Sequence, residues 1–395
     1  MKKIQMADLR AQHRGVRKRI RRRMKRVIKS AAFIQGEEVA VFERNLGRYL
    51  GAKHVISCAS GTDALQIALM ALDLQPGDEV IIPAFTFVSA IEVTTILGLK
   101  PVLVDVNPDT FTLDPMQVKQ AVTHRTKAII ATHLFGQCCD MTSMMEIAEQ
   151  HDLYVIEDAC QAIGSEYILR EGVGELQLGP FTYNYTCTPQ GIRKKAGAVG
   201  HIGCFSFFPT KNLGCYGDGG ALCTQLDDLA EKIRKIASHG ASQKYFHTHV
   251  GVNSRLDTIQ AAVLNVHLPR LNRYNRRRQE IARYYDRSFV SCMQLKVPGR
   301  SPHSTHTFHQ YCLLCRSERE RNALRFHLES LNIPSSVYYP LPLHLQEAYA
   351  HLGYQEGDFP VAENTCRRIL AIPVHPWLSK KQVRYIRRNV LNFFE

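Results

Sequence analysis

The stretch that decides the fold is residues 54–83, HVISCASGTDALQIALMALDLQPGDEVIIP. It begins with a short apolar run at 54–58 and ends with another at 79–83, and each has the length of a buried strand. Between them a turn, Ser60-Gly61-Thr62-Asp63, precedes apolar residues at helical spacing in 64–72. Two strands separated by such a helix form a βαβ unit and lie parallel in one sheet.

The same alternation continues along the chain. Further strands are expected at 101–106, 128–133 and 154–157, and further helices at 88–97, 116–122 and 141–151. Strands of a parallel sheet are covered by helices on both faces, so they form nearly continuous apolar runs, as these do. The sequence therefore predicts an α/β fold with a mostly parallel sheet flanked by helices.

The pattern changes near residue 270. Beyond it, an Arg-rich helix leads into expected strands at 310–314 and 335–339 and expected helices at 318–331 and 380–394. A chain of 395 residues exceeds the size at which one core stops growing, roughly 250–300 residues. We therefore predict a large domain, 1–270, and a smaller C-terminal α+β domain, 271–395. Residues 168–196 lack a period and are expected to form a loop or small hairpin inserted in the large domain.

Charge and composition narrow the class of protein. The chain is 45% hydrophobic, no apolar run reaches the roughly 18 residues of a membrane span, and residues 1–29 are too charged for a signal peptide. A cytoplasmic protein is expected.

The net charge of +14 is concentrated in residues 1–29, where apolar residues at helical spacing predict an amphipathic helix with a basic outer face. That face is either solvated or attracts a polyanion such as a nucleotide diphosphate or a membrane surface. Nucleic acid is not expected, since no known DNA- or RNA-binding signature is present.

The twelve cysteines do not form a metal-binding pattern. They are scattered among apolar residues, and the C-x-x-C pair Cys312–Cys315 has no second pair to complete a zinc site. Buried free thiols are expected, and no metal site.

The strongest chemical signal is residues 203–220, GCFSFFPTKNLGCYGDGG. They contain one lysine, Lys211, among phenylalanines and glycines, and lysine is rarely buried without cause. Desolvation favours the neutral amine of a lysine, which is the form that attacks a carbonyl carbon. Lys211 is therefore a candidate for Schiff-base chemistry.

Two further groups follow expected strands. Asp158 comes directly after the apolar run 154–157, at the carboxyl end where α/β sheets bind ligands, and Gln161 lies three residues on. The turn 60–63 opens a helix after a strand, and such a helix start suits a phosphate. The same turn is equally typical of a plain helix cap.

Four spaced motifs together resemble a known family. They are Gly61-Thr62, Asp158-x-x-Gln161, Ser206 to Lys211 followed by residues 217–220, and Gly251-Val252-Asn253-Ser254-Arg255. In this order they are similar to the DegT/DnrJ/EryC1/StrS sugar-nucleotide aminotransferases, pyridoxal 5′-phosphate (PLP) enzymes of transferase fold type I. The similarity covers nearly the whole chain apart from 168–196.

The resemblance implies a role for each motif residue. Lys211 would bind the cofactor covalently and shuttle a proton, and Asp158 would pair with the pyridine nitrogen. The remaining cofactor contacts would come from Gly61, Thr62 and Ser206 at the phosphate, Gln161 at the ring hydroxyl and Phe87 stacked on the ring. In the family the N-x-R motif reaches in from the neighbouring subunit. Asn253 would then complete the phosphate site and Arg255 would face the substrate, in a homodimer with shared active sites.

The resemblance also indicates a substrate. The runs GTDALQIALMAL, SFFPTKNLGCYGDGGA and GVNSRLDTIQAAVL are similar to enzymes that aminate a UDP-linked 3-keto-N-acetylglucosaminuronic acid with L-glutamate, for surface polysaccharide synthesis. Tyr338-Tyr339 stands where these enzymes have His-Tyr near the sugar, and the insertion is a second departure from their pattern. A 4-keto-6-deoxy nucleotide sugar remains an alternative substrate. Relatives with histidine in place of the lysine are dehydratases, and Lys211 argues against that reaction.

Overall fold

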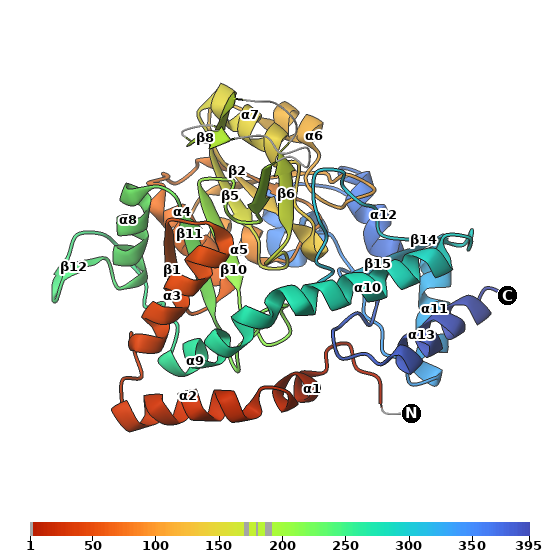
Figure 1. Cartoon of the computed structure of the whole chain (residues 1–395). Coiled ribbons are helices and arrows are strands. Elements are labelled where there is room, and N and C mark those ends of the chain that lie inside the picture. Colours follow the sequence, from red (N-terminus) through yellow and green to blue (C-terminus); the bar gives the residue numbers. More distant parts are fainter. Residues whose placement is uncertain (1–2, 170–173, 179–180, 186–191) are drawn as a thin grey trace.

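A mostly parallel sheet forms the centre of the molecule. The computed structural model describes residues 3–169, 174–178, 181–185 and 192–395. In the sheet the strands follow the order β1-β11-β10-β5-β4-β2-β3 (Figure 1). Their bounds are β1 His54–Cys58, β2 Glu79–Pro83, β3 Lys100–Val104, β4 Thr126–Thr132, β5 Tyr154–Asp158, β10 Ile202–Ser206 and β11 Gly220–Thr224. β11 runs antiparallel to both of its neighbours, and the other pairs are parallel. The predicted α/β fold is confirmed.

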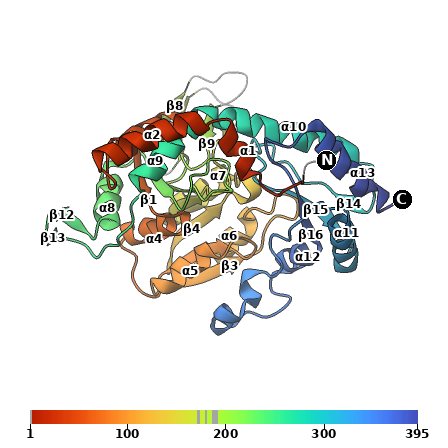
Figure 2. The same cartoon turned by 90° about the horizontal axis from the view of Figure 1, so that it is seen from below.

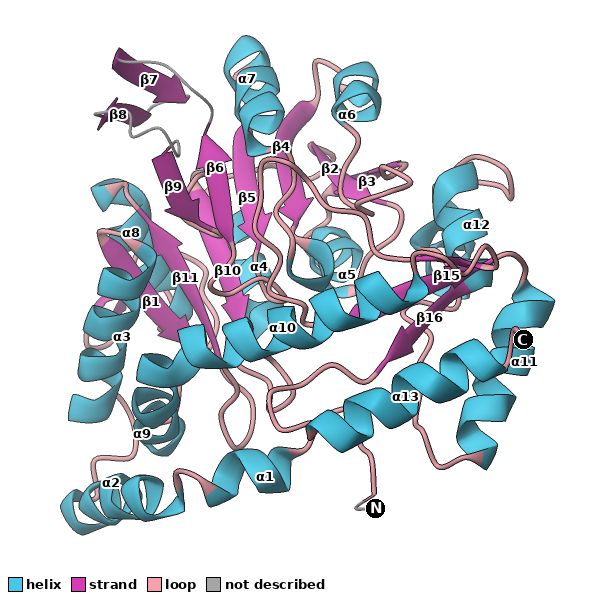
Figure 3. Cartoon of the chain, turned by 45° about the vertical axis from the view of Figure 1, so that its right-hand side comes forward, coloured by secondary structure: helices cyan, strands magenta, loops and turns pink. Residues whose placement is uncertain are grey.

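Helices cover both faces of this sheet (Figure 3). They are α3 Glu37–Leu50, α4 Gly61–Ala71, α5 Ser89–Ile96, α6 Pro115–Ala121, α7 Met141–His151, α8 Asp227–Ala237 and α9 Thr258–His267, with a 3₁₀ turn, η1, at Leu134–Gly136. Side chains alternate between the faces along each strand. Ile129 of β4 packs in the core beneath α3, α7 and α9, whereas the adjacent Ile130 packs in the core beneath α4, α5 and α8. Both faces are therefore buried, which explains the continuous apolar runs.

The C-terminal part has its own core around a small antiparallel sheet. Its elements are η2 Leu268–Arg270, α10 Leu271–Phe289, β14 Leu295–Lys296, β15 Tyr311–Cys315, α11 Glu318–Ser330, η3 Leu343–Leu345, η4 Glu347–Leu352, α12 Pro360–Arg368, β16 Ile369–Ile372 and α13 Lys380–Asn392. The long helix α10 crosses from one part to the other (Figure 1): Leu271 packs in the core of the main sheet, and Tyr285 and Phe289 pack in the C-terminal core. Cys312 and Cys315 are free and buried in β15, as predicted. The division at residue 270 stays a prediction.

The expected strand 335–339 is wrong. Only Ser336 pairs with the small sheet, through an isolated bridge to Ala371 in β16, and β16 was not predicted. After this bridge the chain leaves the sheet and carries Tyr338 and Tyr339 toward the main domain, where Tyr339 binds Gln161. A tertiary contact therefore overrides the local strand pattern.

The inserted segment forms paired strands. β6 Glu166–Leu169 pairs with β9 Ile192–Lys195, and β7 Gly174–Leu178 pairs with β8 Phe181–Tyr185, all antiparallel. The hairpin expectation for 168–196 holds for these strands, and its other positions, 170–173, 179–180 and 186–191, lie outside the described residues.

The basic N-terminal segment is two helices rather than one. α1, Leu9–Arg14, ends at Gly15, and α2, Arg17–Ser30, packs Val16, Ile20 and Met24 against Val263 and Val266 of α9. Seen from below, α2 lies alongside α9 (Figure 2). The apolar stripe is thus buried, and the basic residues face outward.

Two smaller features complete the fold. β12 Ala241–Gln243 and β13 Phe246–His247 form a hairpin that projects from the body and exposes Tyr245 and Phe246 (Figure 1). Among the described residues, no helix combines the length and apolar character needed to cross a bilayer.

Candidate active site

Three of the predicted motifs meet at the carboxyl ends of the parallel strands. Asp158 is the last residue of β5, and Ser206 is the last residue of β10. Gly61 begins α4, three residues after β1 ends at Cys58. A side-chain carbon at Gly61 would lie 2.7 Å from Ser206 Cβ and 2.8 Å from Cys160 Sγ. Only glycine allows this approach, so Gly61 seats the start of α4 against both strand ends.

The start of α4 combines a side-chain helix cap with groups of the kind that bind anions. Ser60 Oγ accepts a hydrogen bond from Asp63 N at 3.0 Å and donates one to Asp63 Oδ1 at 2.7 Å, which is the cap. The N–H groups of Gly61 and Thr62 lie in the first turn, where no intrahelical acceptor exists. Thr62 Oγ1 is hydrogen-bonded to Ser89 Oγ at 2.8 Å, so the hydroxyl of Ser89 also lies at the start of α4. Free N–H groups and hydroxyls at a helix start are the chemistry that binds a phosphate.

Lys211 and Asp158 act on the same buried thiol, Cys160. Burial raises the pKa of Cys160 well above its usual value, Asp158 raises it further, and Lys211 opposes that shift. Cys160 N also donates to Asp158 Oδ1 at 3.1 Å. Lys211 is half-buried, and its own N donates to Phe208 O at 2.8 Å. The half-buried Lys211 and the buried Asp158 therefore both lie near Cys160 at the end of the sheet.

Gln161 is fixed by two hydrogen bonds. Its Oε1 accepts from Phe135 N at 2.9 Å, and its Nε2 donates to Tyr339 Oη at 3.0 Å. Burial raises the pKa of Tyr339, so its hydroxyl keeps its proton. The Tyr339 ring centre lies 6.1 Å from that of Phe87, which is 53% exposed, and 6.0 Å from that of Tyr338. The structure thus brings Gln161, Phe87, Tyr338 and Tyr339 together.

A buried pair behind Asp158 was not predicted. Glu157, fully buried, accepts from His133 Nε2 at 2.7 Å and from the backbone N–H groups of Gly197, Val199 and Gly200. Burial opposes its ionisation, but these hydrogen bonds outweigh burial and lower the pKa of Glu157. His133 N in turn donates to Asp158 O at 3.0 Å, so the pair fixes the backbone that carries Asp158. The acidic residue inside the apolar run YVIE was the available signal.

His309 was also missed. It is buried, and its ring Nδ1 lies 3.4 Å from Asn212 Oδ1, next to Lys211 in the chain. Burial lowers the pKa of His309 well below its usual value, and the charges of Lys211 and Arg278 lower it further. A neutral imidazole therefore lies near the lysine. No local sequence motif marks it.

Asn253 and Arg255 are not part of this cluster within one chain. Arg255 Nη2 donates to Asn253 Oδ1, and Arg255 lines a separate cavity of about 140 Å³ with Glu43 and Arg234. Throughout the part of the chain that is described, no hydrogen bond or ion pair links either residue to Lys211, Asp158 or Gln161. The intervening Ser254 is buried and donates to Asp63 Oδ2, so it ties the motif to the start of α4.

The residues fit the PLP that the resemblance implies. The N–H groups of Gly61 and Thr62, beside the Ser206 hydroxyl, suit its phosphate, and Asp158 suits a protonated ring nitrogen. Lys211 follows β10, which pairs in parallel with β5, and Asp158 is the last residue of β5, so the two residues belong to the same end of the sheet. Within the described ranges no cluster of three or more His, Cys, Asp or Glu is placed to hold a metal ion.

Comparison with known proteins supports the same class. A family model described as the DegT/DnrJ/EryC1/StrS aminotransferase family matches residues 15–391. A Pseudomonas aeruginosa protein named UDP-2-acetamido-2-deoxy-3-oxo-D-glucuronate aminotransferase is 38% identical, covering 97% of this chain and 98% of its own. A Streptomyces venezuelae protein named dTDP-3-amino-3,4,6-trideoxy-alpha-D-glucose transaminase is 36% identical, covering 96% and 93%.

Solved structures of similar fold belong to the same class of enzyme. Streptomyces venezuelae DesV, in complex with a ketimine intermediate, has a TM-score of 0.91 and 35% identity, covering 100% of this chain and 99% of its own. The Bacillus subtilis NtdA structure, with bound cofactor PMP, has a TM-score of 0.85 and 27% identity, covering 100% and 86%. The cofactor of this enzyme class is PLP, and its amino form is PMP. Since a family model matches residues 15–391 and relatives of 36–38% identity cover nearly the whole chain, the chain belongs to the DegT/DnrJ/EryC1/StrS aminotransferase family of PLP-dependent sugar-nucleotide aminotransferases.

Proposed function

We propose that this enzyme moves the amino group of L-glutamate to C3 of a UDP-linked 3-keto-N-acetylglucosaminuronic acid, a step in surface polysaccharide synthesis. The observation that carries the proposal is the placement of Asp158 at the end of β5 and Ser206 at the end of β10, with the start of α4 packed against Ser206, in a chain similar to named nucleotide-sugar aminotransferases. When bound, PLP supplies an electron sink that lets a proton leave the carbon bearing nitrogen.

Each residue has a distinct task in this proposal. Lys211 Nζ would hold the cofactor, and its amine would carry a proton between carbon atoms. The Asp158 carboxylate keeps a proton on the ring nitrogen, which maintains the electron sink. The Gln161 amide and the Tyr339 hydroxyl, already hydrogen-bonded to each other, orient the ring and the sugar. Gly61, Thr62 and Ser206 anchor the phosphate, and Phe87 covers the ring.

The site is complete in the proposal only as a homodimer. Asn253 and Arg255 belong to the family's cross-subunit motif and lie apart from the Lys211 cluster in their own chain. The partner's copies would add a phosphate contact and a cation that faces the sugar.

Two features support the substrate. The UDP-sugar and dTDP-sugar relatives differ in nucleotide, but both names place the reacting position at C3 of the sugar. This common feature favours a 3-keto sugar over the 4-keto-6-deoxy alternative. Arginine binds a carboxylate through two parallel hydrogen bonds, so Arg255 suits an acidic sugar.

Steady-state kinetics on two sugars test the proposal. The wild type is expected to prefer the UDP-linked 3-keto uronic acid over a neutral 4-keto-6-deoxy nucleotide sugar. Arg255→Ala removes a charge-assisted contact of about 1.5–3 kcal/mol, so kcat/KM for the acidic sugar should fall roughly ten- to hundredfold. The loss for the neutral sugar should be much smaller. Arg48→Ala, which removes an exposed arginine elsewhere, is the matched control and should change neither value.

Two outcomes would overturn parts of the proposal. Equal losses for both sugars would show that Arg255 does not recognise the acid. A wild type that prefers the neutral sugar would reject the uronic acid as substrate, while the aminotransferase class would stand.

A further inference from the structure

A second site lies beside the Lys211 loop, between that loop and the N-terminal segment. A cavity of about 590 Å³ is lined on one side by α1 and the residues before it, including Lys3, Arg10, His13 and Arg14. Its other side is Tyr216, which follows Lys211 by five residues in the loop 207–219 between β10 and β11.

The cations of this cavity are not neutralised by the protein. Within the part of the chain that the structure describes, no ion pair or side-chain hydrogen bond engages Lys3, Arg10 or Arg14. The one carboxylate in the lining, Asp8, caps α1 by accepting a hydrogen bond from Ala11 N at 2.8 Å. Three cations around one cavity repel one another unless an anion binds between them.

The cavity is connected to the candidate active site through the loop. His13 Nδ1 is hydrogen-bonded to Tyr216 Oη, and the two ring centres are 5.5 Å apart. Five residues span at most about 18 Å between Cα atoms, so Tyr216 is within that distance of Lys211. The actual separation of Lys211 and Tyr216 is smaller than this limit, because the loop folds back on itself. Cys215 N donates to Phe207 O at 2.8 Å, and Lys211 N donates to Phe208 O at 2.8 Å.

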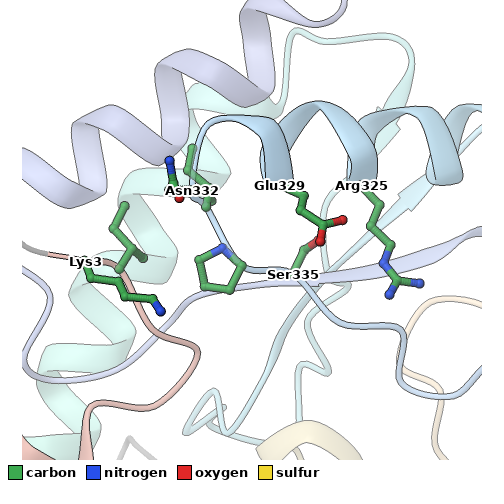
Figure 4. Close-up of a pocket in the computed structure, with 8 residues that line it drawn as sticks. Lys3, Arg325, Glu329, Asn332 and Ser335 are labelled. Carbon is green, nitrogen blue, oxygen red and sulfur yellow. The ribbon is translucent and has the colours of Figure 1, made fainter.

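A cavity with mixed charge provides a contrast. It measures about 290 Å³ and lies between Lys3 and α11, and Figure 4 shows Arg325 and Glu329 projecting from that helix on the side opposite Lys3. There one carboxylate, Glu329, lies with two cations, whereas Asp8 in the cavity at Tyr216 lies with three. No residue of the loop that carries Lys211 is part of the lining of the smaller cavity. The cavity at Tyr216 therefore combines a cationic lining with proximity to the lysine.

We propose that the cavity at Tyr216 binds the diphosphate of the nucleotide-linked sugar. This inference rests on the proposed function, which requires a diphosphate next to the reacting sugar. The guanidinium groups of Arg10 and Arg14 offer paired N–H donors that match phosphate oxygens, and Lys3 adds a point charge. The Tyr216 hydroxyl lies between these cations and the loop that carries Lys211. The two basic N-terminal helices thus have different roles in this proposal. The cations of α1 bind the substrate, and those of α2 face outward.

Calorimetric binding of UDP to the PLP-loaded enzyme tests the proposal directly. The double variant Arg10→Gln/Arg14→Gln should bind UDP at least tenfold more weakly than the wild type, because two contacts to the diphosphate are lost. Uridine, which has no phosphate, should bind equally to both proteins. The matched control is Arg21→Gln/Arg22→Gln, which removes the same charge from exposed positions on α2 and should bind UDP as the wild type does.

Kinetics provide a second measurement on the same variants. Arg10→Gln/Arg14→Gln should raise KM for the nucleotide sugar and leave KM for L-glutamate unchanged. Equal UDP affinity in the wild type and this variant, or an equal loss in the α2 control, would overturn the inference and leave the proposed function intact. A wild type that binds neither UDP nor dTDP would instead contradict the nucleotide substrate itself, and the inference with it.

Discussion

Glu157 and Asp158 are adjacent acids with opposite surroundings. Successive side chains of a strand point to opposite faces of the sheet. Glu157 is enclosed by His133 and the backbone of 197–200, whereas Asp158 is next to the thiol on which Lys211 also acts. One acid therefore stabilises the end of β5, and its neighbour is available for chemistry.

At this scale we predict the effect of neutralising Asp158. Asp158→Asn should still bind PLP, because Lys211 and the start of α4 are unchanged, but it should turn over at least a hundredfold more slowly, since an amide cannot stabilise the protonated ring nitrogen. Cofactor absorption and single-turnover rates measure the two effects separately. Lys211→Ala is the reference and should lose both the yellow absorption of covalently held PLP and the transamination. Unchanged turnover in Asp158→Asn would remove Asp158 from the site.

At the scale of elements, Glu79 holds the start of β2 to its neighbours. Its Oε1 pairs with Arg125 at 2.9 Å and with Lys100, the first residue of β3, at 3.2 Å, and Thr123 donates to Oε2. Burial opposes ionisation, but the hydrogen bonds from Thr123, Arg125 and Lys100 outweigh it and lower the pKa of Glu79 to about 2. This carboxylate therefore stabilises β2, β3 and the turn before β4 only while it is ionised.

We predict a stability difference that depends on pH. A lowered pKa adds stability above the unfolded value of 4.5, and that contribution is lost as the pH falls toward 2. Glu79→Gln should lower the free energy of unfolding by about 2 kcal/mol at pH 7. The gap between variant and wild type should shrink as the pH falls from 4.5 to 2. Urea unfolding across this range measures the gap, with exposed Glu149→Gln as the control. A gap that stays constant with pH would contradict the role of the Glu79 charge.

At the scale of the whole molecule, the proposed site depends on a second chain. Arg255 donates a hydrogen bond to Asn253 and lines a cavity whose lining does not include Lys211. The hairpin β12–β13 next to them leaves Tyr245 81% exposed, an apolar surface that a partner would cover.

Mixing two inactive variants tests this arrangement. Lys211→Ala and Arg255→Ala homodimers should each be nearly inactive, but a mixed dimer would assemble one intact site from the two unaltered halves. With equal amounts and random exchange, activity should recover to about a quarter of the wild-type value. Native mass spectrometry establishes that mixed dimers have formed. If they form and activity does not exceed the sum of the parents, the sites are not shared.

The sequence by itself determined the α/β class and the chemical residues. Apolar runs and helical spacing between 54 and 158 depend on neighbours a few residues apart, so they predicted the strands and helices of the main sheet. Lys211, Asp158 and Gln161 were chosen as candidate site residues in the same way, since each stands in a distinctive local setting. The expected strand at 335–339 failed because a local pattern cannot reveal that Tyr339 binds Gln161, 178 residues away in the sequence.

Only the tertiary structure decided which residues meet. The approach of Gly61 to Ser206, the buried pair of His133 and Glu157, and the cavity between α1 and Tyr216 all join segments far apart in the chain. Strand and helix propensities act over a few residues, whereas such contacts depend on how whole elements pack around the sheet. That packing also separates Arg255 from Lys211, which is the reason the site requires a partner in our proposal.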